Sequence, residues 1–115
     1  MTAINGKVLG ATILHQLGGQ KFLAMTGCKN IVFREVSVVN PKYWLRMNIG
    51  VNSKGVNRLK IYYNEKSDDY TMEFYREVMT KNYEVITSNV KIFENVFFDQ
   101  LQEIFTEATG LYTHL

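Results

Sequence analysis

Two segments in the middle of the chain alternate apolar side chains with aromatic, basic and amide side chains. If residues 44–51 and 58–63 are the strands of a hairpin, the aliphatic side chains share one face of it. The opposite face then carries Trp44, Arg46, Asn48, Arg58, Lys60 and Tyr62. Rings interleaved with cations suit single-stranded nucleic acid, because bases stack on the rings while cations contact the phosphates.

The residues of this face divide by their expected roles. The rings of Trp44 and Tyr62 would stack bases, and the amide of Asn48 could read a base edge. Phosphates would be held by four basic residues, Arg46, Arg58, Lys60 and Lys54. Lys54 stands in a polar turn at 52–57, which would extend the groove.

The register between the two strands decides which of these side chains are neighbours. We expect Met47 to lie opposite Ile61, so that Arg46 lies across from Tyr62. Asn48 then lies across from the cation at position 60. Such a register would place cations among the rings and the amide of this face.

A purely structural interpretation of the same residues stays open. In the simplest register, the strand that follows places Glu73 across from Lys60 and Tyr75 across from Arg58. Glu73 could then neutralise Lys60, and the rings could be present only because aromatic residues favour strands.

The charges of the chain are divided unequally along it. Residues 1–60 contain nine Lys and Arg residues and one Glu, a net charge of +8. Residues 61–115 contain four basic and ten acidic residues, a net charge of −6. A positive surface favours a polyanion such as nucleic acid. Alternatively, the two halves pair with each other within the fold.

Three carboxylates, Asp99, Glu103 and Glu107, are spaced four residues apart in a predicted C-terminal helix. This acidic set is either a solvated face or a surface that meets a basic partner protein. The basic sheet of a second copy could also meet it, so a homo-oligomer is a further possibility.

No enzyme site, metal site or cofactor site is predicted. Cys28, His15 and His114 are far apart in sequence and lack the spacing of metal ligands, and no oxyanion motif accompanies Cys28 as a nucleophile. The neighbouring carboxylates Asp68 and Asp69 would point to opposite faces of a strand, which favours a solvated turn over an acid–base couple.

A sheet and helices are needed to position these residues. Apolar side chains at helical spacing predict a first helix over 6–17, ended by Gly18, and a last helix capped by Asn95 and ended by Gly110. Between them, alternation and turn residues predict strands at 21–26, 30–36, 36–40, 44–51, 58–63, 70–75, 83–87 and 90–93.

This order of elements predicts an α+β fold in a single domain over 1–115. Five or six strands form an antiparallel, meander-like sheet, flanked by an N-terminal and a C-terminal helix packed on one face. The other face is open to solvent. The inward side chains are expected to be Leu45, Met47, Ile49, Leu59, Ile61, Met72 and Phe74.

Composition is that of an ordinary globular protein. Of the 115 residues, 46% are hydrophobic and 21% are charged, with one Pro and one Cys, which excludes disordered chains and disulfide scaffolds. No apolar run approaches the roughly 18 residues of a membrane span, and the N-terminus lacks the apolar segment of a secretory signal. We therefore expect a cytoplasmic protein with no membrane partner.

Two segments of the chain resemble a group of small proteins encoded by bacteriophages, prophages and conjugative elements. The first is ILHQLGGQKFLAMTG at 13–27, and the second is DQLQEIFTEATGL at 99–111. Residues 52–61 and 69–74 fit the same group loosely. The resemblance implies a mobile-element protein that works inside a bacterial cell, and it carries over no catalytic or binding residue.

The function expected from these observations is that of a non-enzymatic accessory protein of a mobile element. It would bind nucleic acid, single-stranded, on the face that carries the rings and cations. The alternative is a protein-interaction module that inhibits or recruits a host protein, for example a defence nuclease, through the acidic set.

Overall fold

The computed structural model of the protein describes residues 6–36 and 42–113. The chain begins with two helices, α1 (Gly6–Leu17) and α2 (Gly19–Thr26). Five strands follow: β1 (Lys29–Arg34), β2 (Tyr43–Asn48), β3 (Arg58–Asn64), β4 (Asp69–Met79) and β5 (Val85–Val96). A short 3₁₀ turn, η1 (Phe98–Gln100), leads into α3 (Leu101–Thr109).

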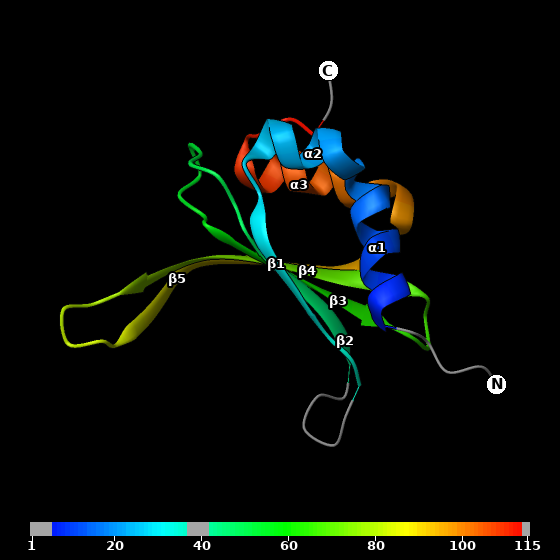
Figure 1. Ribbon diagram of the computed structural model, residues 1–115, viewed down its shortest axis with the longest axis horizontal. Helices are drawn as coiled ribbons and strands as arrows, with labels where there is room; N and C mark the ends of the chain where they lie inside the picture. Colours follow the sequence, from blue (N-terminus) through cyan, green and yellow to red (C-terminus); the bar gives the residue numbers. More distant parts are fainter. Residues whose placement is uncertain (1–5, 37–41, 114–115) are drawn as a thin grey trace.

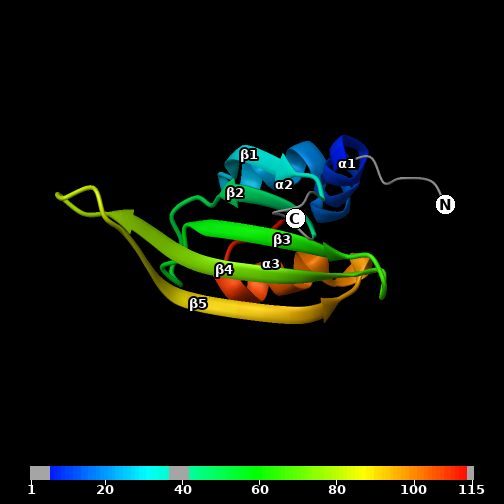
Figure 2. The same ribbon diagram turned by 90° about the horizontal axis from the view of Figure 1, so that it is seen from below.

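The strands form one antiparallel sheet in the order β1-β2-β3-β4-β5, so neighbours in sequence are neighbours in space. Figure 1 shows the three α-helices on one side of this sheet. Figure 2 looks at the other side, with α3 behind the strands. The predicted α+β meander is therefore confirmed, with five strands and a second N-terminal helix. We call the side away from the helices the open face.

The core lies between the helices and the inward side of the sheet. All seven side chains predicted to point inward are buried in one hydrophobic cluster. The helices contribute Phe22 from α2 and Phe105 from α3, whose rings meet edge to face with centroids 5.0 Å apart. Phe74 of β4 reaches the same Phe105 ring at 6.0 Å. Strand alternation thus fixes which residues are left for the open face.

The predicted strand at 21–26 is wrong, because these residues form α2. Its two buried side chains, Phe22 and Thr26, are four residues apart and face the core as helical neighbours. Gly18, at φ +124°, separates helix α1 from helix α2. Gly27, at φ +68°, ends α2, and its N–H donates to the Leu23 carbonyl. The glycine stop predicted for the first helix is confirmed.

Both edge strands contain bulges, and an asparagine with positive φ stands at each of them. Asn30 lies at the register shift of β1, and Asn89 and Asn95 lie at the two shifts of β5. Asparagine tolerates the left-handed conformation better than most residues do. The prediction that Asn95 caps the last helix is therefore wrong. Gln100 instead accepts a hydrogen bond at Oε1 from the N–H of Phe97 at 3.0 Å.

The ends of β4 and β5 project from the body of the molecule as a two-stranded arm (Figures 1 and 2). All side chains from 81 to 90 are exposed. β5 is one continuous strand where two separate pieces were predicted, because the bulge at Asn89 interrupts the alternation without ending the strand. Most of the strand predicted at 36–40 lies outside the described residues.

Candidate nucleic-acid interface

Three cross-strand pairs of β2 and β3 form the centre of the open face. They are Trp44 with Tyr62, Arg46 with Lys60, and Asn48 with Arg58. The alternation predicted from the sequence is correct, since Leu45, Met47, Leu59 and Ile61 are buried beneath them. The sequence-predicted binding residues of the two strands therefore do lie together.

The predicted register of this hairpin is wrong by two residues. Ile61 lies opposite Leu45 instead of Met47, so ring faces ring and cation faces cation. The loop between the strands sets this register. The Ile49 N–H donates to the Asn57 carbonyl at 2.9 Å, and the Asn52 side chain bridges the loop by donating to the Gly50 and Val56 carbonyls.

The aromatic pair is held by cations on the same face. Lys60 Nζ lies 4.4 Å from the ring centroid of Trp44 and 4.9 Å from that of Tyr62. Arg34, opposite Trp44 on β1, places its Cζ 5.7 Å from the indole centroid. Sequence reasoning missed Arg34, and pairing β1 against β2 would have identified it as a neighbour of Trp44. Both rings remain half-buried, with exposed area.

Arg46 is the most exposed cation of the central pairs. It forms no ion pair within residues 6–36 and 42–113, and its cross-strand neighbours are Lys60 and Val32. The predicted pairing of Glu73 opposite Lys60 is confirmed. Nevertheless, the Lys60 ammonium lies over the rings, and no ion pair with Glu73 occurs in the same part of the chain. We call Arg34, Trp44, Arg46, Arg58, Lys60 and Tyr62 the basic face.

Arg58 differs from the other cations because a carboxylate holds it. Its Nε lies 3.2 Å from Glu77 Oε2, and its Nη1 donates to the Asn57 carbonyl at 3.0 Å. Tyr75 lies opposite Arg58, as predicted, and burial is the main cause that raises the pKa of its hydroxyl. The charge of Glu77 raises that pKa further, while Arg46 and Arg58 lower it.

Lys54 does not join the basic face. Its loop, between β2 and β3, rises on the helix side of the sheet in Figure 1. Ser53 of this loop packs against Gly110 at the end of α3, where an added Cβ would lie 2.9 Å from the Ser53 hydroxyl oxygen. The Asn52 side chain also accepts from the Lys54 N–H at 3.1 Å. The expected extension of the groove by Lys54 is therefore wrong, because the loop is folded back onto the helices.

The acidic set of Asp99, Glu103 and Glu107 is exposed on η1 and α3. These elements cover the inward side of the sheet, so the carboxylates lie on the side away from the basic face (Figure 1). The acidic set and the basic face are thus carried by elements on different sides of the molecule.

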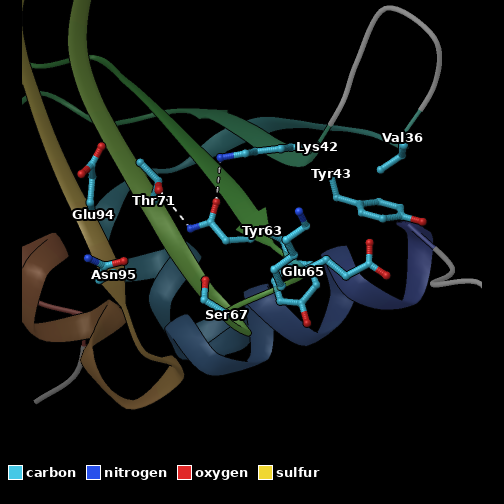
Figure 3. A pocket seen from close by; sticks show the side chains of 11 residues that line it. Val36, Lys42, Tyr43, Tyr63, Glu65, Ser67, Thr71, Glu94 and Asn95 are labelled. Carbon is cyan, nitrogen blue, oxygen red and sulfur yellow. Dashed lines mark hydrogen bonds between the residues drawn. The ribbon is translucent and has the colours of Figure 1, made fainter.

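A polar hollow of about 560 Å³ opens beyond the aromatic pair, where β2 and β4 begin and β3 ends (Figure 3). Lys42 donates to Asn64 Oδ1 at 2.9 Å, and Asn64 Nδ2 donates to Thr71 Oγ1 at 3.2 Å. Tyr63 donates to Asp68 at 2.7 Å, and this hydrogen bond is the main cause that raises the pKa of Tyr63 to about 12. Sequence reasoning missed this hollow, because it is assembled from the ends of separate strands.

The described part of the chain holds no group of three His, Cys, Asp or Glu side chains placed to bind a metal ion. Burial raises the pKa of the Cys28 thiol to about 11, so this sulfur is protonated at neutral pH and is a poor nucleophile. His114 lies outside the described residues. Within those residues, no helix has the length and apolar character needed to span a membrane.

Comparisons of the chain with protein-family models, with curated proteins and with solved structures find no match in any of the three. Function is therefore inferred from the basic face itself.

Proposed function

We propose that the protein binds single-stranded nucleic acid on the basic face of its sheet, as a non-enzymatic accessory protein of a bacteriophage or another mobile element. One observation carries the proposal. Trp44 and Tyr62 lie side by side across β2 and β3 on the uncovered face, and Lys60 lies over both rings. Rings with adjoining cations are the combination that binds bases and phosphates together.

The exposed part of the two rings favours a single strand over a duplex. In a duplex the bases are stacked on one another, and a protein surface meets only the phosphates and the groove edges. In a single strand the bases are free to stack on Trp44 and Tyr62, each contributing about 1–3 kcal/mol. Both rings are half-buried, so each keeps part of its surface exposed.

The strands beneath the basic face supply the electrostatic attraction. No Asp or Glu occurs within β1, β2 or β3, whereas the three strands carry five basic residues: Lys29, Arg34, Arg46, Arg58 and Lys60. Positive charge concentrated on these three strands raises the local concentration of a polyanion and speeds its association.

Lys60 links the two kinds of contact. In the free protein its ammonium lies over the rings, where an exposed cation–π contact is worth about 0.5–1 kcal/mol. A bound base would take the ring surface, and the flexible Lys60 side chain would turn to the neighbouring phosphate. Stacking at about 1–3 kcal/mol per base exceeds the lost contact, so this exchange favours the bound state.

Binding of labelled single-stranded oligonucleotides at low salt, followed by fluorescence anisotropy, tests the proposal. Trp44 is the only tryptophan of the chain, so quenching of its emission reports stacking directly. Trp44→Leu and Tyr62→Leu keep an apolar side chain but remove the ring, and each is expected to weaken binding about tenfold or more.

Tyr112→Leu is the matched control, because Tyr112 is an exposed ring outside the basic face. It is expected to leave the affinity unchanged. Circular dichroism of each variant verifies the fold. The proposal is wrong if no oligonucleotide binds at low salt. It is also wrong if the two ring variants bind oligonucleotides as tightly as the Tyr112→Leu control does.

A basic host protein, for example a defence nuclease, is a second candidate partner. The observation that favours it is the exposure of all three carboxylates of the acidic set, on the side away from the basic face. Capture from host lysate should then be lost with Glu103→Lys and retained with Lys60→Ala. The same charges could join two copies, and light scattering at two salt concentrations would show this as a mass that falls with salt.

A further inference from the structure

The geometry around Arg58 points to a reader of bases within the basic face. Asn57 Nδ2 donates to the Glu77 carbonyl at 2.9 Å, and the Glu77 N–H donates to Asn57 Oδ1 at 2.8 Å. These bonds tie β4 to the start of β3. The Glu77 carboxylate then holds Arg58 at Nε, and the Asn57 carbonyl holds it at Nη1. The guanidinium is therefore held by two residues, Asn57 and Glu77, whose backbones are tied to each other.

The two contacts leave part of the guanidinium available. An arginine has five N–H donors, and Arg58 uses one at Nε and one at Nη1 within the described residues. The other three N–H groups lie on the two terminal nitrogens. The side chain is 25% exposed, and it belongs to the open face of the sheet. A planar pair of donors in a fixed position suits two neighbouring acceptor atoms.

The Glu77 carboxylate also changes what Arg58 binds best. It offsets the charge of Arg58, which weakens the attraction to a phosphate, but it leaves the direction of the free donors unchanged. A neutral base edge with two adjacent acceptors then becomes the better ligand. Guanine offers O6 and N7 in this arrangement, whereas adenine replaces the O6 acceptor with an amino donor.

The position of Arg58 along the strands fits a base next to the stacking site. It lies two cross-strand pairs from the rings, with the Arg46–Lys60 pair between them. Pairs on one face are about 6.6 Å apart, so the reader lies about 13 Å from the rings. Asn48, a second group able to bond a base edge, lies directly opposite Arg58. Rings, phosphate contacts and base reader thus follow one another along the hairpin.

We propose that Arg58, positioned by Glu77 and Asn57, gives the interface a preference for unpaired guanine by donating to O6 and N7. This inference rests on the proposed function and specifies its ligand. Arg46 and Lys60 would contact phosphates of any sequence, whereas Arg58 would distinguish one base from the others.

Thymidine oligonucleotides with one central substituted nucleotide test the preference. Because all flanking bases are identical, the protein can bind at the position along the oligonucleotide that brings the substituted base to Arg58. The central nucleotide is guanosine, adenosine, cytidine or 7-deazaguanosine, which lacks N7. We expect the guanosine oligonucleotide to bind about tenfold more tightly than each of the others. Cytosine is a demanding comparison, because its O2 and N3 are also adjacent acceptors.

Arg58→Ala should remove the preference for guanosine and retain most of the affinity for plain thymidine runs. Arg46→Ala is the matched control, and it should weaken binding to every oligonucleotide by the same factor. Glu77→Gln tests positioning. It should reduce the guanosine preference while the affinity for thymidine runs stays the same or rises, because a negative charge is lost. A merely structural role of Glu77 would lower all affinities together.

The outcomes separate the two proposals. Tight binding of thymidine runs with no preference for guanosine, or with a preference for cytidine, overturns the role of Arg58 and leaves the proposed function standing. A preference for guanosine that survives Arg58→Ala also overturns it. Failure of every oligonucleotide to bind overturns both proposals.

Discussion

The salt dependence of binding is the most quantitative consequence of the basic face. If the proposed function holds, three cations would contact phosphates: Arg34 and Lys60 beside the rings, and the exposed Arg46. Arg58 is left out because Glu77 offsets its charge. Each phosphate contact on a single strand contributes about 0.7 to the slope of log K against log salt, so three contacts predict a slope of about −2.

That slope, about −2.1 before rounding, corresponds to about an 18-fold loss of affinity between 50 and 200 mM salt. Arg46→Ala removes one contact and should reduce the slope to about −1.4, which is about a 7-fold loss over the same range. The slope is measured by anisotropy of a labelled thymidine oligonucleotide at four or more KCl concentrations. A change of slope separates a lost phosphate contact from a general loss of fold.

Lys81→Ala provides the matched control, because Lys81 is an exposed cation at the tip of the arm. Its slope should equal that of the unaltered protein. Two results would refute the reasoning. One is a slope shallower than about −0.7, which would leave no room for three contacts. The other is an equal reduction of the slope by Lys81→Ala and Arg46→Ala, which would show attraction by net charge alone.

Three predictions concern the fold that presents this face. Tyr83 has φ +62° at the tip of the arm, so Tyr83→Gly should raise the free energy of unfolding by about 1 kcal/mol, measured by urea denaturation. Phe105→Ala should lower it by about 3–5 kcal/mol, whereas Phe98→Ala, at an exposed ring, should change it by less than about 1 kcal/mol. The raised pKa of Cys28 means that the unfolded thiol releases its proton at lower pH than the folded one. Stability should therefore fall as the pH rises from about 9 toward 11, and Cys28→Ala should reduce this fall in urea titrations repeated across that range.

Alternation of side chains in the strands was sufficient to predict most of the sheet. A strand has a side-chain period of two, so the buried aliphatic residues of β2 and β3 determine which residues share the other face. This alternation alone was enough to predict that Trp44, Arg46 and Lys60 share the open face. Helix α2 was mistaken for a strand because its short apolar run, around Phe22, fits both periods.

The relations between strands could not be predicted in this way. The β2–β3 register depends on the loop that Asn52 closes with its side chain, and a hydrogen bond of that kind leaves no periodic signal in the sequence. The contact of Arg34 with Trp44 requires the pairing of β1 with β2. Similarly, the hydrogen bond that holds Arg58 Nε is accepted by Glu77, which is 19 residues away along the chain.

The observed register bears on function more strongly than the predicted one would have done. It places Arg46 directly opposite Lys60, and like charges in that arrangement destabilise a sheet by some tenths of a kcal/mol. The predicted register would have placed Arg46 opposite Tyr62 and Lys60 opposite Asn48, and so avoided this cost. Glu73, which also lies opposite Lys60, forms no ion pair with it in the described residues. The cation–π contacts of Lys60, worth about 0.5–1 kcal/mol, offset this cost in the free protein, and a ligand that brings its own negative charges would remove it.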